Sequence, residues 1–306
     1  MAVISRRECL AVGLGAMSAL TACGRKPEPV ITLPDPDGGP FEAVDPKRAR
    51  QEGTLDWAVA AARRSSSDRD RDKYRHPIEL LTFFDVKPND TVVDLWPGAG
   101  YMTEILGPYL THGKGRYVAA LFETNSLADK ATAALIEGYR QHFSSNKTLY
   151  GAVEFSAFGP SSRALVPSDT ADVVLILLVV QDLMAAGIAE KAFADAFQAL
   201  KPGGTLGVEQ HRADIGNVQD PAATNGYVQE PFVKQLAAEA GFQFVASSEI
   251  NANPKDDKDH PFGVWTLPPQ RLTAPRGQPP NPEFDGTLYE SIGESDRMVL
   301  KFRKPQ

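Results

Sequence analysis

The fold is decided by one stretch of the sequence, VVDLWPGAGY at residues 92–101. An apolar run that suits a β-strand leads into a turn with Gly98 and Gly100, and a helical pattern follows at once. Glycines let a chain turn tightly and let its backbone come close to a bound ligand. An acid, Asp94, precedes the turn, and Thr103 stands where a dinucleotide-binding G-x-G-x-x-G motif has its third glycine. The stretch therefore predicts a strand–turn–helix ligand site, favours a ligand with a positive ammonium group and disfavours an NAD-dependent oxidoreductase.

Apolar runs and helical periodicities alternate along the rest of the chain. The apolar runs lie at residues 91–95, 117–122, 153–158, 171–180, 205–209, 242–250 and 298–303. The helical patterns lie at residues 78–84, 101–110, 126–143, 188–200 and 228–240. This alternation predicts a doubly wound α/β sheet of seven mostly parallel strands, and the uninterrupted run at 171–180 suits a central strand buried on both faces. Because no core helix need connect the last two strands, we expect the last strand to run antiparallel.

Glu123 directly follows the second apolar run. A carboxylate in this place can accept hydrogen bonds from both hydroxyls of a ribose, and charge-assisted bonds contribute roughly 1.5–3 kcal/mol each. The alternative is a surface glutamate that begins a helix, where the helix dipole favours an acid. Further along, the segment LKPGG at residues 200–204 predicts a turn between a helix and the fifth strand.

The order of these features resembles that of the class I methyltransferases, which use S-adenosylmethionine (SAM). Their first motif has an acid followed by three alternating glycines, of which Gly98 and Gly100 match the second and third, while Trp96 stands at the first. Glu123 lies where these enzymes hold the ribose, and residues 200–204 are similar to their L-K-P-G-G turn. The resemblance implies a Rossmann-like methyltransferase sheet with SAM as the cofactor. It assigns the cofactor contacts to Asp94, Pro97, Gly98, Gly100, Tyr101, Glu123 and Phe158.

A finer resemblance covers nearly all of residues 70–306. It is to a bacterial family of exported methyltransferases without an assigned substrate, and it rests on Tyr74-Arg75-His76-Pro77, Trp96-Pro97-Gly98, His211-Arg212-Ala213, residues 247–254 and residues 292–298. That family has His-Asn after the fourth strand and Asp before the His-Arg-Ala segment, whereas this chain has Gln181-Asp182 and Gln210. Because both replacements lie where a substrate or a catalytic base is expected, they favour a second hypothesis, a non-catalytic protein that binds an adenosyl ligand.

Candidate catalytic side chains follow the carboxyl ends of the strands, where open α/β sheets bind their ligands. His211 is the candidate base because an unperturbed imidazole titrates near neutrality, and Asp182 is the second candidate. The alternatives are a structural histidine and a helix N-cap. Tyr74 and His76 are the expected substrate contacts before the first strand, unless they belong to a surface segment that leads into a helix. Trp265 is expected in a lid over the substrate, or else as an apolar plug under a long loop.

The N-terminal residues 1–22 have the layout of a signal peptide, with a basic start, a short apolar run and small residues before a cleavage site. Arg6-Arg7 resembles a twin-arginine export signal, and Leu20-Thr21-Ala22-Cys23 resembles a bacterial lipobox, in which Cys23 becomes the lipidated first residue. The alternative is a cytosolic N-terminal helix with a chance cysteine. We expect a protein on the periplasmic side of a bacterial membrane, lipid-anchored through Cys23 and exported by the twin-arginine or the general secretion route.

The remaining chain divides into a tether and one domain. Residues 23–46 are rich in Pro, Gly and Asp, so they are expected to form a flexible tether. Residues 47–306 are expected to form one methyltransferase-like domain, with a helical cap at residues 47–85 and a long lid or insert at residues 251–296.

Composition narrows the function further. The net charge of −7 argues against a nucleic-acid partner, since a phosphate backbone usually needs a basic face. The 5 histidines show no metal-ligand spacing with nearby acids, so no metal site is predicted. The sequence therefore predicts a SAM-dependent methyltransferase for a small or medium organic acceptor, with a non-catalytic adenosyl-ligand-binding lipoprotein as the alternative. It does not predict the oligomeric state.

Overall fold

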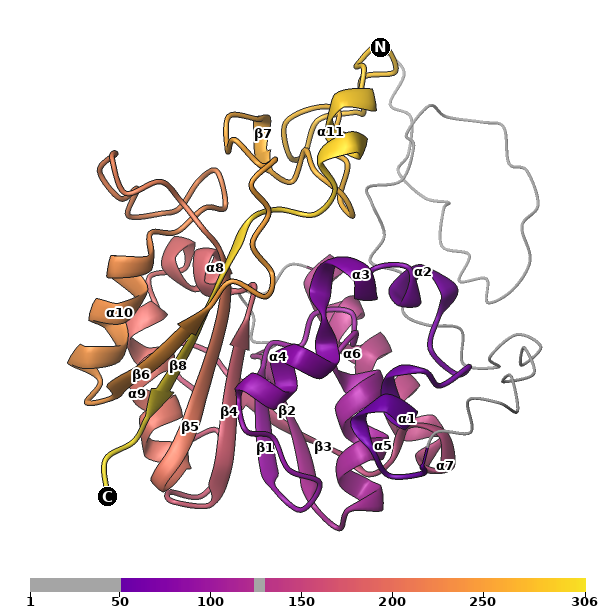
Figure 1. Ribbon diagram of the computed structural model, residues 1–306, viewed down its shortest axis with the longest axis vertical. Coiled ribbons are helices and arrows are strands. Elements are labelled where there is room, and N and C mark those ends of the chain that lie inside the picture. Colours follow the sequence, from indigo (N-terminus) through magenta and orange to yellow (C-terminus); the bar gives the residue numbers. More distant parts are fainter. Residues whose placement is uncertain (1–50, 124–129) are drawn as a thin grey trace, which may run out of the picture.

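A seven-stranded sheet with the order β3-β2-β1-β4-β5-β8-β6 runs through the centre of the computed structural model, which describes residues 51–123 and 130–306 (Figure 1). The five strands from β3 to β5 pair in parallel, and β8 pairs antiparallel with both β5 and β6. This order and these directions are those of the class I methyltransferase sheet, so the predicted doubly wound α/β fold with an antiparallel last strand is confirmed. The strands are β1 Thr91–Leu95, β2 Arg116–Phe122, β3 Val153–Phe158, β4 Ala171–Leu177, β5 Leu200–His211, β6 Gln243–Ser248 and β8 Arg297–Arg303.

Helices cover both faces of the sheet and bury two apolar cores against it. One face carries α1 Leu55–Val59, α4 Pro77–Phe83, α5 Thr103–His112, α6 Lys130–Ser145 and α7 Lys147–Tyr150. The other face carries α8 Val180–Ala185, α9 Ala189–Ala199 and α10 Glu230–Glu239. Two short helices, α2 Ser66–Arg69 and α3 Asp72–Arg75, lie in the segment expected as a helical cap. The helix predicted from Pro77 is α4, and proline suits its first turn because the first backbone N–H groups of a helix have no partner within it.

Two strand boundaries differ from the sequence prediction. The run at 171–180 does not stay extended to its end, because Leu178 takes a left-handed φ of 56° and α8 begins at Val180. The backbone N–H of Val180 donates to Oε1 of Gln210 at 3.2 Å, which caps the new helix. On the neighbouring strand, the predicted turn at 200–204 is an irregularity within β5, where the pairing register shifts and Gly203 takes a φ of 77°.

The insert at 251–296 contains two regular elements that its sequence does not reveal. They are β7 Pro261–Val264 and α11 Thr287–Ile292, and β7 lies outside the seven-stranded sheet. In Figure 1 both lie beyond the carboxyl end of β5, on the side of the molecule that also carries α2 and α3. In residues 51–123 and 130–306, no helix combines the length and the apolar character needed to cross a bilayer.

A buried carboxylate joins the insert to the cap and to the sheet. Glu294 is 2% exposed and accepts hydrogen bonds from Nε of Arg71 at 2.8 Å, from Nε of Arg75 at 3.0 Å and from Arg297. Burial alone would raise the pKa of Glu294, but Arg75, Arg297 and Arg71 outweigh burial and hold that pKa well below its usual range. The ionised Glu294 therefore fixes α3, the end of the insert and the start of β8 against one another.

Replacing Glu294 by alanine should be strongly destabilising, because three guanidinium groups would lose their shared partner inside the protein. Breaking a buried ion pair in this way costs about 3–5 kcal/mol of unfolding free energy. Glu154 is the matched control: its side chain is 45% exposed and pairs with Arg116 on the surface of the sheet. Glu154→Ala should cost at most about 1 kcal/mol. Urea unfolding of both variants measures the difference, and equal losses would contradict the central role of Glu294.

Candidate functional site

The turn after β1 is open on one side and packed on the other. Gly98 and Gly100 take φ values of 60° and 102°, which favour glycine. A Cβ atom added to Gly98 would meet no atom of the described residues within 4 Å, whereas one added to Gly100 would lie 2.3 Å from the ring of Phe143 on α6. Gly100 thus allows the turn to pack on a helix, and Gly98 leaves free space beside the backbone. A ligand that lies flat against the turn has room at Gly98.

Trp96, which stands at the first glycine position of the resembling motif, takes a left-handed φ of 55°. Non-glycine residues seldom adopt this conformation, and where they do they tend to cluster at functional sites. Its indole ring lies 4.4 Å from the ring of Phe122, which lies 6.1 Å from the ring of Phe158. The three rings form a row across the carboxyl ends of β1, β2 and β3. Phe158, expected as a cofactor contact, is buried at the far end of this row.

Glu123 lies next to the end of this row. Its backbone N–H donates to the carbonyl of Phe158 at 2.8 Å, and its Oε2 accepts a hydrogen bond from Oγ of Ser161 at 3.0 Å. Oε1 has no donor among the described residues, so this half-buried carboxylate can still accept hydrogen bonds from a ligand hydroxyl. The residues that would show whether Glu123 begins a helix lie outside the described residues.

Asp94 faces the protein interior rather than the open turn. It is 1% exposed and accepts a hydrogen bond from the hydroxyl of Tyr117 at 2.8 Å. The Thr103 hydroxyl lies 3.0 Å from that of Tyr117 and 2.5 Å from that of Tyr139, which extends the network. Burial raises the pKa of Asp94 to about 7, against the opposing hydrogen bond from Tyr117. The expected contact with a ligand ammonium stays a prediction, and within the protein Asp94 supports the turn from beneath it.

Tyr101, also expected as a cofactor contact, ties the turn to the cap. Its hydroxyl donates to Oδ1 of Asp72 at 2.5 Å. The guanidinium groups of Arg64, Arg71 and Arg75 lie 5.0, 5.6 and 4.7 Å from the centre of its ring. The side chain is buried in these contacts and offers no free hydroxyl to a ligand. Pro97 contributes through its backbone, since its carbonyl accepts from the N–H of Gly100 at 3.1 Å and closes the turn.

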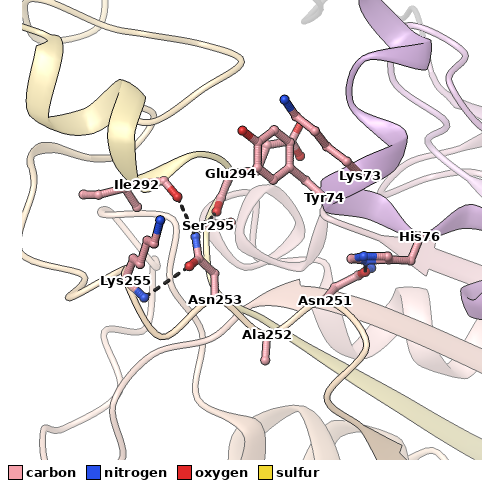
Figure 2. A pocket seen from close by; sticks show the side chains of 10 residues that line it. All are labelled: Lys73, Tyr74, His76, Asn251, Ala252, Asn253, Lys255, Ile292, Glu294 and Ser295. Atoms are coloured by element: carbon pink, nitrogen blue, oxygen red, sulfur yellow. Dashed lines mark hydrogen bonds between the residues drawn. The ribbon is translucent and has the colours of Figure 1, made fainter.

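A pocket of about 180 Å³ lies between the cap and the insert (Figure 2). Its lining residues are Lys73, Tyr74, His76, Asn251, Ala252, Asn253, Lys255, Ile292, Glu294 and Ser295. Two of the expected substrate contacts, Tyr74 and His76, are among them. The asparagines and the residues from 292 to 295 carry no chemical motif by themselves, and only the finer resemblance points to their segments.

His211 is not the near-neutral imidazole that the sequence suggests. Its Nδ1 lies 2.6 Å from Oγ of Ser295, through which it reaches the pocket. Burial lowers the pKa of His211 to about 3, and Arg297 and Arg75 reinforce the effect. The ring is therefore neutral at physiological pH and a weak base. The expectation of titration near neutrality is wrong chiefly because the ring is buried, and the charges of Arg297 and Arg75 add to the effect of burial.

Asp182 and Gln210 both make hydrogen bonds at or near the start of α8. Asp182 lies inside the first turn of α8, whose N-cap is Val179, so the N-cap alternative is wrong. Its Oδ2 accepts from Nε2 of Gln181 at 3.1 Å, and burial raises its pKa. Gln210 donates from Nε2 to the carbonyl of Gly226 at 3.1 Å, in addition to capping α8. Neither Asp182 nor Gln210 lines the pocket.

Trp265 also lies outside the pocket lining. The guanidinium of Arg276 covers its ring at 3.7 Å from the ring centre. A Cβ atom added to Gly226 would lie 3.2 Å from the ring, so the indole packs closely on that loop. These contacts favour the second interpretation of Trp265, an apolar side chain packed under a long loop, over a lid above the substrate.

One group of metal-ligating side chains occurs in the part of the chain that the structure describes, namely Asp256, Asp257 and His260. The sequence analysis did not single it out. Asp256 is buried and already accepts hydrogen bonds from Tyr227, from Nε2 of His260 and from the backbone N–H groups of residues 258 and 296. We therefore interpret this group as an anchor inside the insert.

Comparison with known proteins adds only a likeness of fold. No protein-family model and no curated protein matches the sequence. A SAM-dependent methyltransferase from Aquifex aeolicus is 17% identical, with a TM-score of 0.43 over 60% of this chain and 87% of that one. An arsenic(III) SAM methyltransferase from Chlamydomonas reinhardtii is 12% identical, with a TM-score of 0.45 over 84% of this chain and 75% of that one. The [4+2]-cyclase SpnF is 16% identical, with a TM-score of 0.44 over 76% of this chain and 80% of that one.

Asp94→Asn should change how stability depends on pH. The pKa of Asp94 is about 7 in the folded protein, above its value in an unfolded chain, so the folded state holds a proton that the unfolded state has lost between about pH 4 and 7. This group alone should therefore lower stability as pH rises through this window, by at most about 1.4 kcal/mol per pH unit. Asparagine cannot lose that proton, so the stability of the variant should fall less steeply than that of the wild type. The fall that Glu104 causes should remain, because burial raises the pKa of Glu104 to about 8.

Urea unfolding between about pH 4 and 9 measures this effect. Asp259→Asn, at an exposed position of the insert, is the control and should keep the slope of the wild type. An unchanged slope in Asp94→Asn would show that the buried carboxyl does not hold the proton.

Proposed function

We propose that the chain binds SAM across the carboxyl ends of β1 and β2 and catalyses methyl transfer to a small or medium organic acceptor. The observation that carries the proposal is the open space at Gly98 beside the half-buried carboxylate of Glu123, on a sheet with class I methyltransferase order. Ligands of open α/β sheets bind at this edge. SAM, when bound, supplies a methyl group made electrophilic by its sulfonium sulfur.

The donor and acceptor groups of the site fit an adenosyl ligand. A ribose offers two hydroxyl donors, which match the unoccupied lone pairs of Glu123. The backbone at Gly98 allows close approach, and the indole of Trp96 with the ring of Phe122 provides an apolar wall between the two. Methyl transfer needs a nucleophile held in line with the methyl group, so the contribution of the protein would be mainly positioning.

A second candidate function is the binding of an adenosyl ligand without catalysis. Its support is that the two catalytic candidates from the sequence have unsuitable surroundings: His211 has a pKa of about 3, and Asp182 lies outside the pocket. A protein of this second kind would bind an adenosyl ligand and would release no methylated product with any acceptor. Detection of a methylated acceptor in the presence of SAM separates the two functions.

We also propose that the protein is exported and held at a bacterial membrane by a lipid on Cys23. The signal segment and Cys23 lie outside the described residues, so the support for this proposal is the sequence alone. Cells fed radiolabelled palmitate should label the wild-type protein and not Cys23→Ser. Equal labelling of the two, or labelling of neither, would contradict the lipid anchor.

Calorimetric titration of the purified protein with SAM and S-adenosylhomocysteine tests the adenosyl site. We expect binding by the wild type and at least roughly ten-fold weaker binding by Glu123→Ala, because charge-assisted hydrogen bonds contribute about 1.5–3 kcal/mol each. Gly98→Ala should also weaken binding, because its methyl group enters the space reserved for the ligand. Its cost in stability should stay near the 1–2 kcal/mol, roughly, of a left-handed alanine.

Glu154→Ala, which removes an exposed carboxylate from β3, is the control and should bind both ligands like the wild type. Absence of binding by a folded wild-type protein would overturn the proposed function. If both single variants, Gly98→Ala and Glu123→Ala, bound the ligands as tightly as the wild type, the ligand site would lie elsewhere.

A further inference from the structure

The buried polar groups around the cap–insert pocket are already paired. Nδ2 of Asn253 donates to the carbonyls of Ile292 and Glu294 at 3.0 and 2.7 Å, and the hydroxyl of Ser295 is held by His211. Figure 2 shows how the side chain of Asn253 connects its own segment to the segment that contains Ile292 and Glu294. These groups give the pocket a fixed shape and leave little hydrogen-bonding capacity for a ligand.

The charges beneath the pocket also balance within the described residues. Carboxylates and guanidinium groups of the cluster are equal in number: Asp68, Glu209 and Glu294 against Arg71, Arg75 and Arg297. The two lining lysines are not balanced in this way. Neither Lys73 nor Lys255 has a carboxylate of the described residues within ion-pair distance of its ammonium group. The ammonium group of Lys73, which lies 4.9 Å from the centre of the Tyr74 ring, and that of Lys255 can therefore both pair with an anion at the rim of the pocket.

The hydrogen bonds around His76 fix which of its ring nitrogens carries the proton. Nδ2 of Asn251 donates to Oε1 of Glu209 at 2.7 Å and to the carbonyl of Arg75 at 3.2 Å. The amide oxygen of Asn251 must then face His76, where it lies 2.9 Å from Nδ1. An amide oxygen only accepts, so Nδ1 of His76 carries the proton and Nε2 of the neutral ring carries a lone pair. A base that is oriented by a second group, itself oriented by a carboxylate, is an arrangement suited to proton transfer.

The backbone supports the same interpretation. His76 takes a left-handed φ of 39° between α3 and α4, a conformation that non-glycine residues seldom adopt and that tends to occur at functional sites. Figure 2 shows His76 and Asn251 on one side of the pocket and Lys255 on the other. His76 and Lys255 thus lie apart, as a molecule with a hydroxyl at one end and an acid at the other requires.

We propose that this pocket is the acceptor site, that it takes a small anionic molecule with an ionisable hydroxyl, and that His76 is the base. The proposal rests on the proposed methyltransferase function. Lys73 and Lys255 would pair with the anion, and Asn251 is the positioning residue for His76. The volume of about 180 Å³ is smaller than the roughly 300–1,000 Å³ of sites for drug-sized ligands, which fits a small acceptor.

The chemical step balances with the groups named. The hydroxyl proton of the acceptor passes to Nε2 of His76 as the oxygen electron pair forms a bond to the methyl carbon of SAM. The bond between that carbon and sulfur breaks, and its electrons stay on sulfur. The products are a methyl ether, a neutral thioether and a protonated imidazole, which returns its proton to solvent.

The first test measures the charge preference of the pocket without SAM. Calorimetric titration of the full protein with 4-hydroxybenzoate and with the neutral 4-hydroxybenzamide compares two probes of nearly equal shape. We expect the acid to bind at least ten-fold more tightly than the amide. The double variant Lys73→Met with Lys255→Met should lose this preference, while Lys147→Met, at an exposed position on α7, should keep it. Equal affinities of the wild type for the two probes, or no binding of either, would overturn the anionic acceptor site.

The second test concerns His76 and Asn251. In protein labelled with nitrogen-15 at histidine, the ring resonances of His76 should show the proton on Nδ1. Asn251→Leu should remove this preference while the other assigned histidines keep theirs. A proton on Nε2 of His76 in the wild type would overturn its role as the base.

The two proposals fail separately. Both of these measurements are made without SAM, so a protein that binds no SAM can still show the anion preference and the histidine tautomer. A protein that binds SAM through Glu123 but has neither property keeps the proposed function and loses this inference.

Discussion

The structure depends most on the buried carboxylate of Glu294. Its three arginine partners come from α3, from the N-cap residue before it and from the first residue of β8, and the cap and β8 are more than 200 residues apart in the sequence. Two of them, Arg71 and Arg75, also lie over the ring of Tyr101 at the end of the glycine turn. A single ionised group thereby holds the cap, the end of the insert and the ligand turn in one arrangement. A buried ion cluster is a poor source of net stability, so its value here is that it specifies how these segments meet.

The buried polar groups beneath the turn differ from those beside the pocket in where their hydrogen-bond networks end. Beneath the turn, Asp94, Tyr117 and Thr103 form a hydrogen-bonded layer inside the apolar core that holds the end of β1 in place. Beside the pocket, a chain of hydrogen bonds runs from Glu209 through Asn251 to Nδ1 of His76. In the first case the network ends in the protein, and in the second it ends at a cavity. That difference separates support from chemistry better than residue type does.

The sequence predicted the fold well because the fold follows from local patterns. Apolar runs, helical spacing and the glycine turn are all read within short windows, and a doubly wound, mostly parallel sheet follows from their alternation. The position of the Asp94 side chain was also open to prediction: residues alternate along β1, and a central strand buried on both faces leaves no exposed side for an acid. The acid-first pattern instead suggested a ligand contact, which stays a prediction for a side chain that is 1% exposed.

The sequence could not predict the pocket for a physical reason. His76 and Asn251 are 175 positions apart, and nothing in either segment alone indicates that they meet. The low pKa of His211 likewise appears only on folding, since burial is its main cause and Arg297 and Arg75, from opposite ends of the domain, add to it. The finer resemblance marked the segments that line the pocket, but the choice of His211 as the base came from its place at the end of a strand, where burial could not be foreseen. Contacts between distant segments determine which side chains meet at the pocket and what pKa values they have, and these contacts form only when the chain folds.

A crystal structure of the protein grown with S-adenosylhomocysteine tests the central claim, the adenosyl site at the end of β1 and β2, most directly. The account predicts ligand density along the turn, in van der Waals contact with Gly98 and with the ribose hydroxyls within hydrogen-bond distance of Glu123. A crystal saturated with the ligand that leaves Gly98 and Glu123 untouched would contradict it, and the fold would then serve another ligand.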